Sequence, residues 1–176
     1  MATALQHNST LTSLDLYNNN IGASGVSALA TALQHNSSLT TFDLGCNKID
    51  DSAVSGLATA LQLNSSLSSL DLSYIEIGAA GANALAKALQ YNSTLTYLDL
   101  RFNSIGDSGA SALATALQHN SSLTTIHFQF PPHLSSQVTE LCERNKVNTV
   151  KRSSSLFELL LPFLTFSSSL HSEALG

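Results

Sequence analysis

Aspartate recurs every 28 residues along much of the chain, and these carboxylates have the clearest capacity for chemistry. The column consists of Asp15, Asp43, Asp71 and Asp99, with His127 one period later. Side chains at one repeat position on adjacent strands would lie about 4.8 Å apart. Such a column can be a solvated feature of the repeat, a docking surface for a basic partner, or a divalent-cation site. The cation site is the weakest interpretation, because each strand supplies one carboxylate and no ligand loop converges on it.

Aromatic side chains and an arginine accompany this column. Tyr17 and Arg101 occupy the same repeat position, and Tyr74 and Phe102 follow on the adjoining loops. Aromatic residues and arginine are the types that dominate binding energy at protein interfaces. We therefore predict a partner-binding surface on the concave face. Its predicted residues are Tyr17, Asp43, Asp71, Tyr74, Tyr97, Asp99, Arg101, Phe102 and His127.

Catalytic chemistry has little support in the sequence. There is no P-loop, no HExxH motif, and no GxGxxG between a strand and a helix. Serine is abundant, but no serine, histidine and aspartate are forced together as a triad. We expect that the protein is not an enzyme and binds no cofactor or metal ion.

A repeated unit of 28 residues must position all of these side chains. Units start at Leu11, Leu39, Leu67 and Leu95, and a fifth start follows at Leu123. The first half of each unit alternates polar and apolar residues, which predicts a short, half-buried strand.

The second half of each unit changes to helical spacing. Val26, Leu29, Ala30 and Leu33 share one helix face, and the other units repeat this pattern. One strand and one helix cannot bury their own apolar faces, so the units must stack. The predicted fold is an α/β solenoid, a right-handed β-α superhelix with a parallel sheet on its concave face and helices on its convex face.

The consensus LxxLDLxxNxIGxxGxxALAxAL resembles the ribonuclease-inhibitor-like class of leucine-rich repeats, which also occurs in NOD-like receptors and in the Ran GTPase-activating protein. The resemblance covers residues 1–150. It implies a ladder in which a repeated asparagine bonds the loop backbone. Asn19, Asn47 and Asn103 match this asparagine, and Ile75 replaces it in the third unit. We expect a local ladder defect at Ile75 without loss of the fold.

The helix ends carry their own signals. Asp51 and Asp107 are predicted helix N-caps. Asparagines recur where each helix should stop, and a left-handed conformation is expected there. They are Asn36, Asn64, Asn92 and Asn120. Together with Asn8 they begin five Asn-Ser-Ser/Thr sequons, but no export signal is visible, and glycosylation is not expected.

The repeat register predicts the domain organisation. The predicted segments are a half repeat at 1–10, full repeats at 11–38, 39–66, 67–94 and 95–122, a degenerate capping repeat at 123–150, and a non-repeat tail at 151–176. The first segment matches the middle of a repeat helix, so we expect a fragment of a longer solenoid. The alternative is a natural short form whose open edge pairs with another chain; otherwise we expect a monomer.

The tail contains the apolar run LFELLLPFLTF, which is too short to span a bilayer. Packing of Leu156, Leu159 and Leu160 on the last helix is the preferred interpretation. Disorder and a helix on a membrane surface or a partner remain alternatives.

Composition narrows the function further. The net charge of −5 disfavours nucleic-acid binding. Only two cysteines occur, which favours a reducing compartment and a cytoplasmic location. We predict a protein-interaction module whose partner has a basic face. The resemblance also implies two alternatives, a small-GTPase regulator of the Ran-activator type and a ligand-sensing fragment of a NOD-like receptor.

Overall fold

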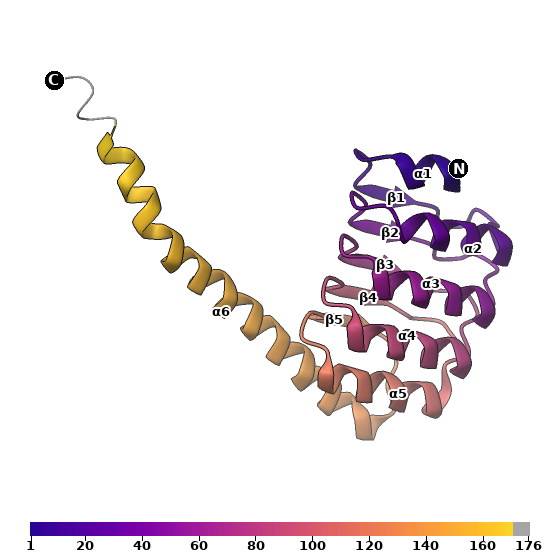
Figure 1. Ribbon diagram of the computed structural model, residues 1–176. Helices are drawn as coiled ribbons and strands as arrows, with labels where there is room; N and C mark the ends of the chain where they lie inside the picture. Colours follow the sequence, from indigo (N-terminus) through magenta and orange to yellow (C-terminus); the bar gives the residue numbers. More distant parts are fainter. Residues whose placement is uncertain (171–176) are drawn as a thin grey trace.

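The computed structural model describes residues 1–170, and for residues 152 and 154–170 it describes the backbone only. Within this range, short strands alternate with helices (Figure 1). The strands are β1 (Ser13–Asp15), β2 (Thr41–Asp43), β3 (Ser69–Asp71), β4 (Tyr97–Asp99) and β5 (Thr125–His127). The helices are α1 (Ala2–His7), α2 (Gly22–Leu33), α3 (Asp51–Leu63), α4 (Ala79–Tyr91), α5 (Gly106–His119) and α6 (Pro132–Leu170).

The strands form one parallel sheet in chain order, and neighbouring strands are offset by one 28-residue unit. Thus Asp71 pairs with Asp99, and Asp99 pairs with His127. The sheet lies on one side of the stack and helices α1 to α5 lie on the other (Figure 1). The predicted α/β leucine-rich-repeat solenoid is confirmed.

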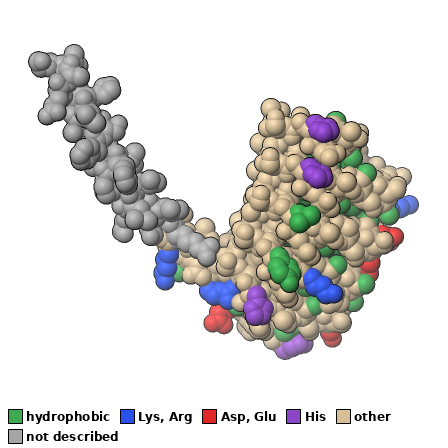
Figure 2. Space-filling view, viewed as in Figure 1, with side chains coloured by type: hydrophobic (Ala, Val, Ile, Leu, Met, Phe, Trp, Pro, Cys, Tyr) green, Lys and Arg blue, Asp and Glu red, His purple; other side chains and the backbone are tan. Residues whose placement is uncertain are grey.

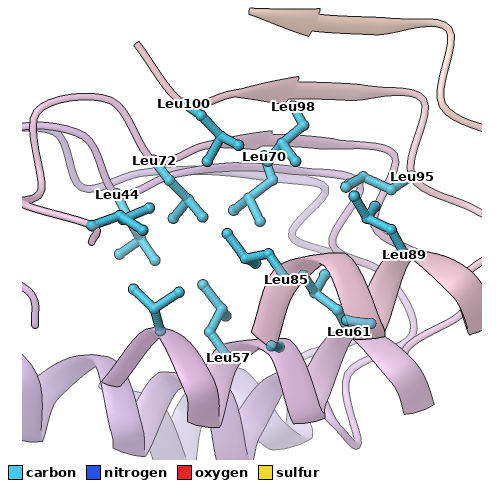
Figure 3. Packing of buried hydrophobic residues seen from close by; sticks show 14 of the residues in the cluster. Leu44, Leu57, Leu61, Leu70, Leu72, Leu85, Leu89, Leu95, Leu98 and Leu100 are labelled. Carbon is cyan, nitrogen blue, oxygen red and sulfur yellow. The ribbon is translucent and has the colours of Figure 1, made fainter. Parts of the chain in front are cut away.

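Leucines from both layers meet in a continuous core (Figure 3). Leu70 and Leu72 project from the sheet side toward Leu57 of α3 and Leu85 of α4, and all four are 0% exposed. Burying one such leucine contributes about 1.5–3 kcal/mol. The core therefore fixes the spacing of the units, and with it the spacing of the side chains on the concave face.

Buried asparagines line the descending loops, which lead from each helix to the next strand. The Asn64 amide nitrogen donates to the carbonyls of Leu33 (2.8 Å) and Asn36 (2.9 Å) in the preceding unit. Its oxygen accepts from the backbone N–H groups of Ser66 and Leu67. Equivalent contacts are made by Asn36, Asn92 and Asn120.

The expected left-handed conformation at these helix stops is wrong. Asn64, Asn92 and Asn120 have φ between −72° and −76° with extended ψ values. These asparagines bridge successive units through their side-chain amides. The position therefore requires a carboxamide side chain, and it does not require a residue that tolerates positive φ.

A second asparagine ladder follows the ascending loops, which lead from each strand to the next helix. Asn47 donates to the carbonyl of Leu16 and accepts from the N–H groups of Asn19 (3.2 Å) and Ile21 (3.0 Å). Asn103 forms the equivalent bonds with the third unit. Between these two bridges, Ile75 is fully buried and offers no polar group. The expected ladder defect is confirmed.

The third helix begins differently from the prediction. Asp50, rather than Asp51, is the N-cap of α3, and its carboxylate accepts from the N–H of Ala53 at 2.9 Å. Asp51 instead accepts from the N–H of Gly78 at 2.8 Å, which links the second unit to the third. This bond gives the two units a polar contact at the junction where Ile75 provides none. Asp107 lies inside α5, which has no side-chain cap, so the predicted cap at Asp107 is also wrong.

The start of α6 closes the array. Asn145 is 0% exposed and donates to the carbonyls of Asn120 and Leu123, which extends the descending ladder by one rung. Arg144 donates to the carbonyls of Leu117 and Asn120 at the end of α5. The helix then continues away from the stack (Figure 1).

The division of the chain at residue 150 stays a prediction. The expected contacts of Leu156, Leu159 and Leu160 lie outside the described side chains. None of the helices formed by the described residues combines the length and hydrophobicity that a membrane crossing requires.

Candidate functional site

The aspartate column lies at the carboxyl ends of the strands. One oxygen of each carboxylate accepts from the backbone N–H two residues later, at 2.8–3.0 Å. Burial increases along the column: Asp15 is exposed, Asp43 and Asp71 are half-buried, and Asp99 is 0% exposed. Each carboxylate of the column therefore holds the backbone turn that follows its strand. The four aspartates differ in the contacts of their second carboxylate oxygen.

Asp99 is enclosed by a cluster of polar side chains. The Nε of Arg101 donates to both oxygens of Asp99, at 3.0 and 2.9 Å. The Tyr97 hydroxyl lies 3.4 Å from Oδ2 of Asp99 and 3.3 Å from Nδ1 of His127. The rings of Tyr97 and His127 meet edge to face, with centroids 5.2 Å apart. Four predicted site residues are thus brought together.

The surroundings of Asp43 and Asp99 have opposite effects on their acidity. Burial raises the pKa of Asp43, and the carboxylates of Asp71 and Asp15 raise it further, against the hydrogen bond from Gly45. Burial would also raise the pKa of Asp99, but the hydrogen bonds and charge of Arg101 outweigh it and hold this pKa below its usual value. At neutral pH Asp99 is therefore a paired anion, which suits binding more than proton transfer.

The aspartates at Asp15, Asp43 and Asp71 keep one oxygen open. Within residues 1–170, the described contacts of these carboxylates use a single oxygen each, on the backbone. In the same range, no three histidine, cysteine, aspartate or glutamate side chains are grouped so that they could hold a metal ion. Figure 2 shows that charged side chains are thinly scattered over the face it views, with hydrophobic groups between them.

An aromatic ridge follows the ascending loops beside the column. The Tyr74 and Phe102 rings stack with centroids 4.1 Å apart, although their side chains stay 48% and 65% exposed. Both residues have a positive φ, near +56° and +59°, as do Asn18 and Cys46 at the same repeat position. A left-handed conformation costs about 1–2 kcal/mol for most residues. Of these four residues, only Asn18 is of a type that commonly adopts the left-handed conformation. The sequence therefore did not indicate this strain.

Hollows open along the ascending loops. One of about 290 Å³ lies beside Tyr74, next to the defect at Ile75. A second, of about 560 Å³, separates the ascending loops of the fourth and fifth units. Its lining residues are Arg101, Phe102, Asn103, Ile126, His127, Phe128 and Gln129. A third hollow, of about 720 Å³, shares Asn103, Phe128 and Gln129 with the second and is lined by Pro131, which stands at the ladder position.

The predicted site residues therefore fall into two groups. Tyr97, Asp99, Arg101 and His127 form the cluster at the fourth and fifth units, and Phe102 borders the same hollow. Asp43 and Asp71 are adjacent rungs of the open part of the column. Tyr17 is 47% exposed near Gly45, and Tyr74 joins the two groups through its stack on Phe102.

The repeated strand–helix unit, the parallel sheet and the two asparagine ladders define a repeat solenoid. A family model described as Leucine Rich repeat matches residues 7–30, 35–58, 63–86 and 91–114, which together make up more than half of the chain. The chain belongs to the leucine-rich repeat family. Its assignment to the ribonuclease-inhibitor-like class stays a prediction.

Solved structures resemble this chain over nearly its whole length. Leiomodin-1 actin-binding site 2 has a TM-score of 0.83 and 24% identity, over 92% of this chain and 95% of that chain. The tropomodulin C-terminal domain of Caenorhabditis elegans has a TM-score of 0.80 and 18% identity, over 88% and 96%. At this identity the likeness shows the fold alone. No curated protein matches the chain.

Proposed function

We propose that the chain is a protein-interaction module that binds a partner through its concave face and the adjoining aromatic ridge. The observation that carries this proposal is the open aspartate column beside exposed aromatic rings. Asp43 and Asp71 each leave an oxygen open, and Tyr17 and Tyr74 remain about half exposed next to them. A similar structure is described as an actin-binding site, which supports a protein as the partner.

The partner's face over the first three units is basic in this proposal. The contact between Arg101 and Asp99 shows, within this chain, how a guanidinium group binds one carboxylate of the column. Planar guanidinium groups match carboxylates with directional bonds, so partner arginines would suit the open rungs. The GTPase-regulator and receptor-fragment alternatives stay predictions.

Site-specific photo-crosslinking tests the face that binds. A photoreactive amino acid at Thr41 would stand on the concave face, and the same substitution at Thr59 would stand on α3; both threonines are exposed and belong to the same unit. We expect a crosslinked partner from position 41 and none from position 59, and the Asp43→Asn/Asp71→Asn double variant should weaken binding of that partner. Crosslinking from position 59 alone would overturn the concave-face proposal.

The buried sequons support a cytoplasmic location. The Asn64 side-chain nitrogen already donates to two backbone carbonyls, and a glycan on that nitrogen would remove a donor and insert a sugar into the core. Asn36, Asn92 and Asn120 are buried to the same degree. We infer that the protein folds where N-glycosylation does not occur.

This inference is tested by directing the chain into the secretory pathway with an added signal peptide. We expect glycosylation of these sequons and protease-sensitive, aggregated product, whereas replacing the sequon Ser or Thr residues by alanine should restore folding. A glycosylated chain that folds as well as the cytoplasmic form would contradict the inference.

A further inference from the structure

The fourth unit supplies its own cation to the aspartate column, and the second and third units do not. Arg101 follows Asp99 by two residues, and its guanidinium group donates to both oxygens of that carboxylate. Gly45 and Ser73 occupy the same repeat position in the second and third units, and neither side chain carries a charge. Among the described residues, no cation pairs with the aspartates of those two units.

Side chains from the first three units converge above Gly45. A Cβ atom at this position would lie 3.0 Å from both Oγ of Ser73 and Cδ2 of Tyr17. It would also lie 3.2 Å from Oδ1 of Asp43. An aromatic ring, a carboxylate and a hydroxyl thus border one point, and glycine lets them come this close because it adds no side chain between them. We call these four residues the Gly45 cluster.

The hydroxyl of Ser73 has no hydrogen-bond partner, although Ser73 is only 6% exposed. Its N–H donates to Asp71 and its carbonyl accepts from Cys46, but no hydrogen bond among the described residues uses its Oγ. Every fully enclosed side-chain nitrogen or oxygen of the described residues has a partner, so this Oγ must still be reachable from solvent. A hydroxyl placed in this way gains from a donor that a bound molecule brings to it.

The two carboxylates beside this hydroxyl call for a cationic donor. Asp43 and Asp71 are paired in register on adjacent strands, and each uses Oδ1 on the backbone and keeps Oδ2 open. A cation that touches both carboxylates relieves their mutual repulsion. A guanidinium group has five donors and no acceptor, and its flat face packs on aromatic rings such as that of Tyr17. These properties favour arginine over the compact ammonium group of lysine.

We propose that the Gly45 cluster and Asp71 bind one arginine side chain of the partner protein. The guanidinium group donates to the open oxygens of Asp43 and Asp71 and to Oγ of Ser73, and its face packs on the ring of Tyr17. The contact repeats between two chains what Arg101 does within the fourth unit. This proposal rests on the proposed protein-binding function and deepens it, because it names one residue of the partner and the place where that residue binds.

A peptide titration tests the site without the natural partner. The probe is Ac-Ala-Arg-Ala-NH2, added to the isotope-labelled full chain and followed by amide NMR, and in its matched control uncharged citrulline replaces arginine. We expect the largest shifts at the amides of Gly45 and Ser73, whose N–H groups donate to Asp43 and Asp71. Affinity should be about tenfold higher for the arginine probe, because charge-assisted hydrogen bonds are stronger than neutral ones. Equal affinities, or no shift at these two amides, would overturn the proposal.

A lysine probe, Ac-Ala-Lys-Ala-NH2, tests the choice of arginine. It carries the same charge but cannot stack a flat cation on Tyr17, so we expect its affinity to be about threefold lower than that of the arginine probe. A lysine probe that binds as tightly as the arginine probe would contradict an arginine site.

Two serine variants show whether the unpaired hydroxyl belongs to the site. Ser73→Ala should weaken the arginine probe about fivefold and leave the urea midpoint unchanged, because this hydroxyl has no partner in the free protein. Ser69→Ala removes a hydroxyl at the opposite end of β3, beyond Asp71, and should change neither the affinity nor the midpoint. Equal affinities of the two variants, or a lower midpoint for Ser73→Ala, would contradict the proposal. Crosslinks from position 41 together with a failed titration would overturn this site and leave the proposed function standing.

Discussion

The two edges of the sheet are built differently. On the descending edge, at the amino ends of the strands, buried asparagines make the same contacts in successive units, and Asn145 adds the last rung. On the ascending edge, at the carboxyl ends, Ile75 and Pro131 interrupt the ladder, and hollows lie beside both positions. The descending edge therefore fixes the stacking of the units. The ascending edge can vary from unit to unit, which is what recognition of a particular partner requires.

Loss of a descending rung should have the largest effect on stability. Asn92→Ala removes an amide that is 6% exposed and bonds to the carbonyls of Leu61 and Asn64 and to the N–H groups of Thr94 and Leu95. Leaving these buried groups unpaired should lower the free energy of unfolding by about 3 kcal/mol. Urea unfolding would show a lower midpoint with an unchanged slope.

Loss of an ascending rung should cost less. Asn103→Ala removes a bridge of similar size, but Asn103 is half-buried and water from the adjoining hollow can replace part of it. We expect a loss of about 2 kcal/mol in the same urea experiment. Equal losses in Asn92→Ala and Asn103→Ala would remove the energetic distinction between the two edges.

The contrast between the edges was only partly predictable from the sequence. The period, the strand–helix alternation and the defect at Ile75 followed from apolar spacing and from one substituted asparagine. The descending ladder did not, because an asparagine at a helix end is equally compatible with a left-handed cap. Only the three-dimensional stacking shows that the Asn64 side chain points back to the carbonyl of Leu33, 31 residues earlier.

The candidate site shows the same limit. Register alone placed Asp99, His127 and Arg101 near one another, and the sequence predicted their shared surface. It did not indicate that Asp99 is fully buried while Asp15 is exposed, because burial depends on the neighbouring units on both sides. The hollow lined by Pro131 was also missed. It arises because proline at the ladder position cannot make the bridging contacts that asparagine makes there.

The paired rung at Asp99 should have a pH-dependent effect of intermediate size. The pKa of Asp99 is lowered in the folded protein, so its charge stabilises the fold above the unfolded pKa, and this stability is lost as the pH falls through the folded pKa. Asp99→Asn should therefore cost about 1–2 kcal/mol at neutral pH, after allowance for the solvent exposure of Arg101, and progressively less in acid. Urea unfolding of both proteins at several pH values between neutrality and acid measures this difference. A deficit that does not change with pH would assign the effect to packing instead of charge.

The open rung at Asp43 should give the smallest effect, with the opposite sign. The pKa of Asp43 is raised in the folded protein, so its charge opposes folding above the folded pKa, and the penalty disappears as the pH falls toward the unfolded value. Asp43→Asn keeps an oxygen for the N–H of Gly45 and should raise stability at neutral pH by about 0.3 kcal/mol, because the group is half solvated. Thermal unfolding at neutral and acidic pH would measure this gain and its disappearance in acid. If the variant is more stable yet binds the captured partner less well, the carboxylate at Asp43 is retained for recognition at the expense of stability, which is the behaviour expected of the ascending edge. A loss of stability at neutral pH would instead place Asp43 with the structural rungs.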